Sequence, residues 1–191
     1  MDVEKAIMTR RTIRKYKQQP ISRDILVRLI EGARLAPSAS NLQPLVYLVI
    51  DDPDQLESVF GLLGWAGYLA PSGTPREGEK PVAYIIVLAN THIRMSGFEH
   101  DAGAAIENIL LMAWSMGIGS CWIGSVDKKA LADLYQIPDH YVIDSVVALG
   151  YAAETSIAED AEDSIRYYKD ENQVLHVPKR KLKDICFFNE I

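Results

Sequence analysis

The sequence has 191 residues, of which 48% are hydrophobic and 24% are charged. This length and composition are typical of one globular domain, and they exclude an intrinsically disordered or collagen-like chain. Twenty Lys and Arg residues against 26 Asp and Glu residues give a net charge of −6, which disfavours non-specific binding to nucleic acids.

The N-terminal residues are charged and do not form the apolar core of a signal peptide, and no apolar run approaches the ~20 residues of a spanning helix. We therefore expect a cytoplasmic protein that binds neither membranes nor nucleic acids. Cys121 and Cys186 do not constitute a disulfide framework in a chain of this length, so reduced thiols are expected. The histidines lack the close spacing of metal ligands, and we expect no metal site.

The predicted elements alternate between helices and strands. Helical periodicity and capping residues predict helices over 2–9, 22–35, 99–116 and 128–135, and another that begins near residue 54. Apolar β-rich runs predict strands over 45–50, 82–89, 120–125 and 142–151, and the uninterrupted run at 82–89 is typical of a central strand. Asp2 and Ser22 are the expected N-caps. This alternation predicts an α/β or α+β sandwich.

Three stretches lack a clear period. Glycines and prolines interrupt residues 61–81, where Trp65, Tyr68 and Leu69 supply apolar side chains, and we expect a loop-rich lid with mobile parts. The alternative is that Trp65 and Tyr68 are ordinary core residues. Residues 154–163 carry five acidic side chains and no basic one, which predicts a solvated linker. The tail, residues 164–191, regains basic and aromatic character, and we expect it to dock.

A basic segment interrupts this acidic chain. Arg10, Arg11, Arg14, Lys15 and Lys17 lie within eight positions, at a break between a helix and a loop. Their donors and the hydroxyl of Thr12 can converge on a phosphate. The alternative is a solvated basic surface.

A polar loop precedes the first long strand. In the segment 37–44, Asn41 and Gln43 each offer donors and acceptors, which the edge of a planar heterocycle requires. A simple turn is the alternative. The sequence contains no G-x-G-x-x-G, no P-loop and no G-x-S-x-G motif. Cys121 has the strand neighbours Trp122 and Ile123, which favour an inert, partly buried thiol over a nucleophile.

Four motifs, taken in order along the chain, resemble those of the FMN-dependent nitroreductase family. RRTIRKY at 10–16 resembles the family's phosphate motif RRSxRxF, and APSASNLQP at 36–44 resembles its loop APSxxNxQPW. GIGSCWIG at 117–124 resembles the strand GLGTCWIG, and LGY at 149–151 is followed by a basic PKRK. Thr12 replaces the usual Ser and keeps its hydroxyl, whereas Leu45 replaces a frequent Trp.

The resemblance implies a fold and a cofactor site. The fold is an α+β three-layer sandwich with a mixed, mostly antiparallel sheet flanked by helices, in an interlocked homodimer that binds FMN at its interface. The implied contacts to the FMN phosphate and ribityl chain are Arg10, Arg11, Thr12, Arg14 and Arg180, with Lys179 or Lys181 as alternatives to Arg180. The implied contacts to the flavin are Ser38, Ala39, Ser40, Asn41 and Gln43, partly from the other subunit, together with Cys121, Trp122, Ile123 and Gly124.

The resemblance also implies an activity, in which NADH or NADPH gives hydride to FMN and the reduced flavin passes it to a nitroaromatic, quinone or similar electron-poor acceptor. No catalytic side chain is expected, because the flavin carries the chemistry. We expect Trp65 and Tyr68 to contact the substrate. The alternatives are a flavin-dependent dehalogenase-like enzyme and a flavin-binding or sensing protein without turnover.

Overall fold

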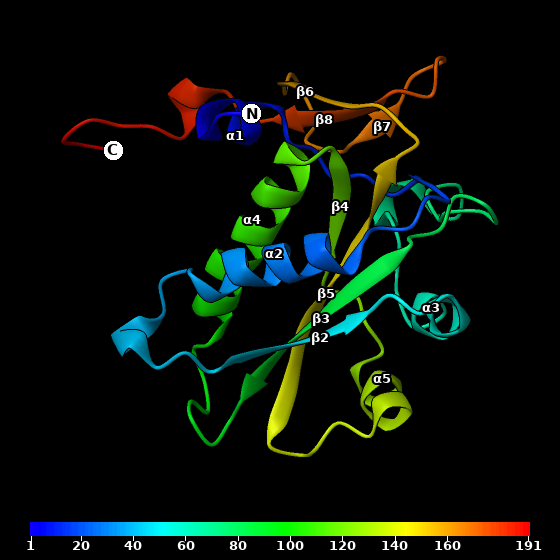
Figure 1. Ribbon diagram of the computed structural model, residues 1–191. Coiled ribbons are helices and arrows are strands. Elements are labelled where there is room, and N and C mark those ends of the chain that lie inside the picture. The colour runs from blue at the N-terminus through cyan, green and yellow to red at the C-terminus, as the bar shows by residue number, and fades with distance from the viewer.

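A five-stranded sheet lies between two layers of helices in the computed structural model, which describes residues 1–191 (Figure 1). The strands are β1 (Tyr16–Lys17), β2 (Leu45–Ile50), β3 (Ala83–Asn90), β4 (Ile118–Ile123) and β5 (Tyr141–Ala152). All of these strands pair antiparallel, in the spatial order β2, β3, β5, β4, and β1 pairs with the end of β5. A parallel bridge joins Thr12 to Ser120 on the other edge of β4. The predicted mixed, mostly antiparallel sheet is confirmed.

Five α-helices surround this sheet. They are α1 (Val3–Thr9), α2 (Arg23–Arg34), α3 (Pro53–Phe60), α4 (Glu99–Ser115) and α5 (Lys128–Tyr135). The chain also forms three short 3-10 helices, η1 (Ala39–Asn41), η2 (Gly67–Leu69) and η3 (Leu182–Asp184). Asp2 caps α1 by accepting the N–H of Lys5 at 2.7 Å. Ser22 occupies the N-cap position of α2, but its side chain makes no capping hydrogen bond. None of the helices combines the length and apolar character needed to cross a bilayer.

Strand β3 explains why the layers form on both faces of the sheet. Its alternate residues Ala83, Ile85 and Val87 pack against α2 and α4, whereas Tyr84, Ile86 and Leu88 face the side of α3 and α5. All six are buried. Because burial of one large aliphatic side chain contributes about 1.5–3 kcal/mol, a strand buried on both faces is a major source of stability. The predicted central strand and three-layer sandwich are confirmed.

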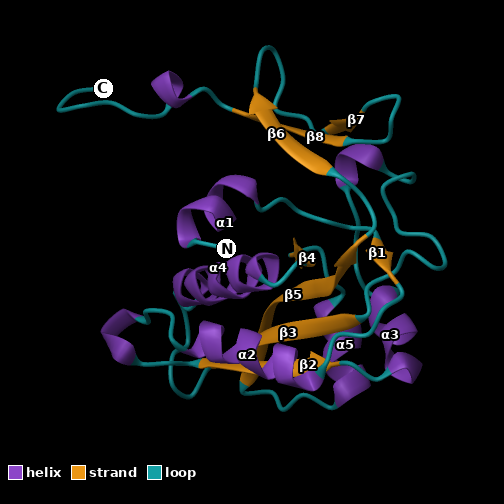
Figure 2. Ribbon diagram, turned by 45° about the horizontal axis from the view of Figure 1, so that its top comes forward, coloured by secondary structure: helices purple, strands orange, loops and turns teal.

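The C-terminal part of the chain forms a second, three-stranded sheet, which lies above the main sheet in Figure 2. Strand β8 (Leu175–Lys179) lies between β6 (Ser156–Asp160), which is parallel to it, and β7 (Tyr168–Lys169), which is antiparallel. The prediction of a solvated linker over 154–163 is therefore wrong. The side chain of Glu154 is only 5% exposed, and its carboxylate pairs with Lys169 at 3.0 Å and accepts the backbone N–H of Arg14 at 2.7 Å.

The end of the chain leaves this small sheet and runs away from the body of the molecule (Figure 1). Several of its apolar side chains are exposed, and Phe188 is exposed over 83% of its surface. The other exposed apolar residues of this stretch are Leu182, Ile185, Phe187 and Ile191. Within one chain, the last ten residues therefore have no apolar surface against which to pack these side chains.

Candidate functional site

The basic segment, residues 10–17, is attached to the edge of β4 through its uncharged residues. The N–H of Ile13 donates to the carbonyl of Ser120 at 2.9 Å, and the hydroxyl of Tyr16 donates to the carbonyl of Ile13 at 2.5 Å. The side chains of Ile13 and Tyr16 are buried, at 1% and 0% exposure. The cationic side chains of the segment are thus placed beside β4 without contributing to the core.

The guanidinium groups of two arginines of this segment form no ion pair, although the backbone N–H of Arg14 donates to the carboxylate of Glu154 at 2.7 Å. Arg11 donates to the carbonyls of Arg10 and Met8, and its buried Nε has no hydrogen-bond partner. The guanidinium of Arg14 lies over the ring of Tyr167, 5.1 Å from its centroid, and makes no ion pair. Burial and the neighbouring charge of Arg10 lower the pKa of Arg11. An anion bound here would relieve this excess of positive charge.

Arg10 differs from these two arginines, because its Nε lies 3.4 Å from the carboxylate of Glu107 on α4. Thr12 forms the parallel bridge to Ser120 on β4. The structure therefore brings the predicted residues 10–14 and the predicted strand residues of β4 together in one place.

The four predicted residues at the end of β4 differ in exposure. Cys121 and Ile123 are buried on the α3 and α5 side of the sheet, so they can meet a ligand only through their backbone. Burial raises the pKa of the Cys121 thiol to about 11, although the nearby Arg14 opposes this shift. This agrees with an inert thiol. Trp122 and Gly124 are exposed, and the indole N–H of Trp122 donates to the hydroxyl of Ser145 at 2.7 Å.

The 38–43 loop is fixed by a buried carboxylate that the sequence analysis missed. The hydroxyl of Ser38 donates to Asp101 at 2.6 Å, and the N–H of Ala39 donates to the same carboxylate at 3.2 Å. Arg94 also contacts Asp101 at 3.2 Å. Ser40, Asn41 and Gln43 have φ angles of +52°, +55° and +52°. An acidic residue on a largely apolar helix was the only local signal for this role.

The 38–43 loop and the basic segment lie near opposite ends of α4 (Figure 1). The loop contacts Asp101 in the first turn of α4, whereas Thr9, just before the basic segment, accepts a hydrogen bond from Trp114 in the last turn. At 1.5 Å per residue these two positions are about 20 Å apart along the helix. One chain therefore does not bring Ser38, Ala39, Ser40, Asn41 and Gln43 to the predicted phosphate residues.

The predicted tail residue Arg180 also lies apart from the basic segment. It is exposed and donates to the carbonyl of Asp184 at 2.7 Å. Arg180, Arg166 and Tyr68 line a cavity of about 510 Å³. Lys181, one of the two alternatives, pairs with Glu162 at 3.1 Å, and the other, Lys179, ends β8.

The two predicted substrate residues occupy different environments. Trp65 is 8% exposed and stacks on Phe60, with ring centroids 5.3 Å apart. This places Trp65 in the core between α3 and the sheet, so the structure supports the core alternative for Trp65 and not a contact with substrate. Tyr68, by contrast, is 54% exposed.

A model of the nitroreductase family matches residues 7–94 and 80–151 of this sequence. The chain belongs to the nitroreductase family. The matched residues include the basic segment, the 38–43 loop, and β4, so they cover every predicted site residue except those of the tail.

Individual relatives agree with this membership of the nitroreductase family. A protein of Archaeoglobus fulgidus, provisionally assigned as an NADH dehydrogenase/NAD(P)H nitroreductase, is 35% identical over 83% of this chain and 90% of its own length. An FMN reductase (NADPH) of Bacillus subtilis is 26% identical over 78% of this chain and 66% of its own.

A solved structure from Desulfovibrio desulfuricans, provisionally assigned as a nitroreductase and determined in complex with FMN, has the same fold. Its TM-score is 0.72 at 23% identity, and the match covers 100% of this chain and 98% of that one.

Proposed function

We propose that this protein is an FMN-dependent oxidoreductase that takes hydride from NADH or NADPH and reduces nitroaromatics, quinones or similar electron-poor acceptors. The names of its relatives, an NAD(P)H nitroreductase and an FMN reductase, support this activity. The observation that carries the proposal is the pair of arginines, Arg11 and Arg14, that lie beside β4 and whose guanidinium groups form no ion pair.

The residues of the basic segment fit the phosphate of FMN. Arg14 presents its guanidinium on the ring of Tyr167, and Arg11 has a buried donor, Nε, that no protein atom satisfies. Planar guanidinium groups bind phosphate oxygens through paired hydrogen bonds, and Thr12 adds a hydroxyl. Next to them, Trp122 and Gly124 at the end of β4 are exposed and can line the flavin. When bound, FMN supplies the hydride relay between NAD(P)H and the acceptor.

The functional unit in this proposal is a homodimer. The 38–43 loop does not reach the basic segment of its own chain, so its implied contact with the flavin requires a second copy. An apolar groove supports this arrangement, because Val3, Leu35, Leu111 and Met112 line it and Val3 is 72% exposed. The exposed apolar residues of the tail, such as Phe188, would be covered in the same assembly.

The test is a comparison of cofactor content and turnover. We expect the purified protein to be yellow, to release FMN and not FAD on denaturation, and to oxidise NADH or NADPH in the presence of a nitroaromatic or quinone. Protein that cannot be reconstituted with FMN would contradict the proposal. Binding of FMN without turnover would instead identify the flavin-binding or sensing alternative. Sedimentation should give a dimer, and a stable 21.3 kDa species with full FMN occupancy would contradict the dimer.

The phosphate contact is tested by Arg11→Ala, with Arg23→Ala as the matched control. Arg23 is an exposed arginine that pairs with Asp51, which follows β2 at the edge of the sheet opposite β4. We expect Arg11→Ala to weaken FMN binding about 10- to 150-fold, because one charge-assisted hydrogen bond contributes roughly 1.5–3 kcal/mol. Equal losses in the two variants would indicate a general effect on folding.

A further inference from the structure

Tyr167 links two parts of the candidate site that are far apart in the sequence. The backbone N–H of Tyr68, in the 61–81 segment, donates to the hydroxyl of Tyr167 at 3.3 Å. The two rings pack with centroids 4.9 Å apart and planes tilted by 46°. The guanidinium of Arg14 also lies against the Tyr167 ring, 5.1 Å from its centroid. Tyr167 thus contacts both an arginine proposed to hold the cofactor and a residue expected to contact the acceptor.

The stack continues beyond Tyr68 to a fourth side chain. Arg166 places its guanidinium 5.1 Å from the centroid of the Tyr68 ring. The order of the stack is therefore Arg14, Tyr167, Tyr68 and Arg166, and its members come from the basic segment, the tail and the 61–81 segment. Each cation lies against one ring, and such a cation–π contact is attractive, so both contacts help to hold the two tyrosines together.

The contact with Tyr167 is the one hydrogen bond that holds the middle of the 61–81 segment to another part of the chain. The beginning of the segment is fixed, because Gly64 donates to the carbonyl of Ser125 at 2.8 Å and Trp65 is buried in the core. The end is fixed by Glu79, whose carbonyl accepts the N–H of Tyr16 at 2.9 Å. Between residues 66 and 78, all other hydrogen bonds stay within the segment.

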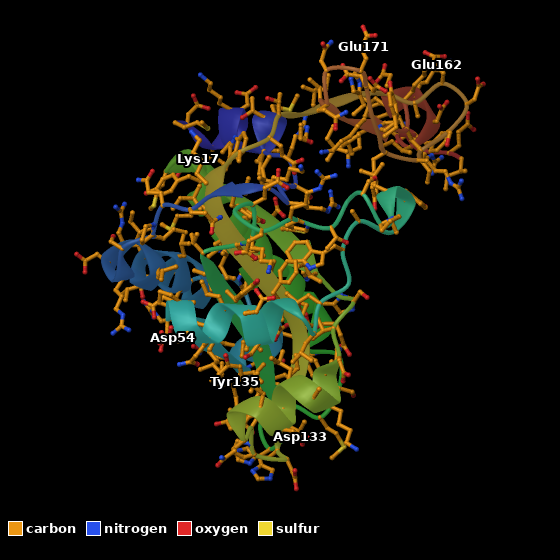
Figure 3. The ribbon with its side chains drawn as sticks, turned by 90° about the vertical axis from the view of Figure 1, so that its right-hand side faces the viewer. Lys17, Asp54, Asp133, Tyr135, Glu162 and Glu171 are labelled. Carbon is orange, nitrogen blue, oxygen red and sulfur yellow. The ribbon has the colours of Figure 1, made fainter.

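The structure also provides space into which Tyr68 could move. The cavity of about 510 Å³ that Arg166 and Arg180 line lies beside Tyr68. Elsewhere the 61–81 segment packs closely against its neighbours. Ala66, Leu69 and Gly73 leave a gap of only about 10 Å³ between the segment and the residues that face it, which are Arg14 and residues of the tail. Figure 3 shows η2 beneath the part of the chain that carries Glu162, just before the tail begins. The position of Tyr68 therefore depends on Tyr167, the side chain of the tail that contacts it.

We propose that Tyr167 is a positioning residue that clamps the 61–81 segment through Tyr68 and thereby sets which acceptors fit the site. The effect on acceptor preference rests on the proposed function. The clamp, by which we mean the attachment of the 61–81 segment to Tyr167 through Tyr68, does not, because all of its contacts lie within this chain.

The variants that test the clamp are Tyr167→Leu and Tyr167→Phe, with Tyr168→Leu as the matched control. Tyr167→Leu removes the ring and the hydroxyl, whereas Tyr167→Phe removes only the hydroxyl. Tyr168, the next residue, instead stacks on His176 at 4.8 Å. Tyr68→Leu and the double variant Tyr68→Leu/Tyr167→Leu complete a cycle, in which we expect the double variant to behave like either single one.

The first readout is amide hydrogen exchange over residues 66–73 in the protein as purified. We expect exchange there to be at least about tenfold faster in Tyr167→Leu, slightly faster in Tyr167→Phe and unchanged in Tyr168→Leu. Unchanged exchange in Tyr167→Leu, or equal acceleration in Tyr168→Leu, would overturn the clamp. If Tyr167→Leu does not fold, Tyr167→Phe and Tyr68→Leu decide the same question.

The second readout is acceptor preference, which a merely structural role would not change. We expect Tyr167→Leu to change the ratio of kcat/KM for a bulky and a small quinone at least about fivefold, while the Kd of FMN changes less than about fivefold, because a cation–π contact at an exposed site is weak. An unchanged ratio with faster exchange would overturn the inference about acceptors. If the unmodified protein neither binds FMN nor oxidises NAD(P)H, the proposed function fails, whereas the exchange result still decides the clamp.

Discussion

The ring of Tyr16 lies directly against Gly150, so closely that a Cβ at position 150 would come within 2.7 Å of Tyr16 Cδ1 and 2.8 Å of its Cβ. Tyr16 in turn fixes the basic segment, because it pairs with Ala152 on β5 and its hydroxyl donates to the carbonyl of Ile13. We therefore expect Gly150→Ala to displace Tyr16 and to lower the free energy of unfolding by about 1–3 kcal/mol, the usual cost of overpacking. Urea unfolding measures this loss.

The control for Gly150→Ala is Gly61→Ala. At Gly61 the nearest atom to an added Cβ is the carbonyl oxygen of Glu57 at 3.7 Å, an ordinary contact. The stability of Gly61→Ala should be unchanged or slightly higher. Equal destabilisation by the two substitutions would mean that the contact with Tyr16 is not the cause.

The buried Trp65 predicts a large loss of stability on truncation. Trp65→Ala should cost about 3–5 kcal/mol, because it leaves a cavity beneath Phe60. Trp65→Phe should cost less, since the indole Nε1 has no hydrogen-bond partner to lose. Thermal unfolding of both variants measures the difference. A stable Trp65→Ala protein with altered acceptor preference would restore the role of Trp65 in contacting substrate.

The environment of Cys121 predicts that its thiol is unreactive. Because burial raises its pKa to about 11, the reactive thiolate is a very small fraction at pH 8. Cys186 is exposed. With a thiol-specific chromogenic reagent at pH 8, we expect Cys186→Ser, in which Cys121 is the one thiol, to show no rapid equivalent and to react only after unfolding. Rapid modification of Cys121 in the folded protein would refute this.

Asp101 is expected to hold the 38–43 loop. Asp101→Asn should cost about 1–3 kcal/mol and speed amide exchange at Ala39 and Gln43, because Arg94 loses its charged partner and Ser38 a charged acceptor. Burial alone would raise the pKa of Asp101, but the hydrogen bonds from Ser38 and Ala39 and the charge of Arg94 together lower it. Its contribution is therefore complete above the ordinary pKa and is lost as the pH falls through the folded pKa.

Glu99→Gln is the control for Asp101→Asn, since Glu99 lies in the same turn of α4 but is exposed. It removes the same charge at the same helix end. If Glu99→Gln loosens the loop as much as Asp101→Asn, the effect comes from the helix terminus and not from the contact with Ser38.

His176 predicts that the small sheet weakens as the pH rises. Its Nδ1 lies 2.6 Å from Glu159 on β6 and its Nε2 3.5 Å from Asp170, which follows β7, while the ring of Tyr168 stacks on it. The hydrogen bond to Glu159 raises the pKa of His176, burial opposes this, and Asp170 adds to it. The protonated ring therefore stabilises the sheet fully below about pH 6.5, and this contribution disappears as the pH rises through the folded pKa.

Amide exchange of β6 and β8, corrected for its intrinsic pH dependence, measures this effect. Protection should fall as the pH rises from about 6.5 through the folded pKa in the unmodified protein and become nearly independent of pH in His176→Gln. His92→Gln, which alters an exposed histidine next to His140, should leave the profile of the small sheet unchanged. A flat profile in the unmodified protein would count against the role of His176.

Local patterns predicted the elements of the main sheet well, because their periodicity reflects which faces are buried. The uninterrupted apolar run of β3 is such a case, since Ile85 and Ile86 face opposite layers and both are fully buried. The same patterns failed where the partner is distant in the sequence. Glu154 looked solvated because the cation that pairs with it, Lys169, lies beyond the acidic stretch.

The site could be predicted as a set of residues but not as an arrangement. Motif resemblance identified the basic segment and the 38–43 loop, yet it could not show that α4 holds them apart. Asp101 was missed because its partners Ser38 and Arg94 meet it only in the folded chain. Trp65 was expected at the surface because glycines surround it in the sequence, whereas in the structure its ring packs in the core beneath α3.

In the basic segment, one set of residues makes the attachment to the sheet and another set carries the positive charge. Ile13 and Tyr16 attach it to the sheet, whereas Arg10, Arg11 and Arg14 carry its charge, and no side chain does both. Substitutions at the charged positions can therefore accumulate during evolution with little loss of folding free energy. If these arginines bind an anion, as we propose, descendants of such a chain could exchange it for another anion while keeping the same scaffold, and a designer could do the same by changing three arginines.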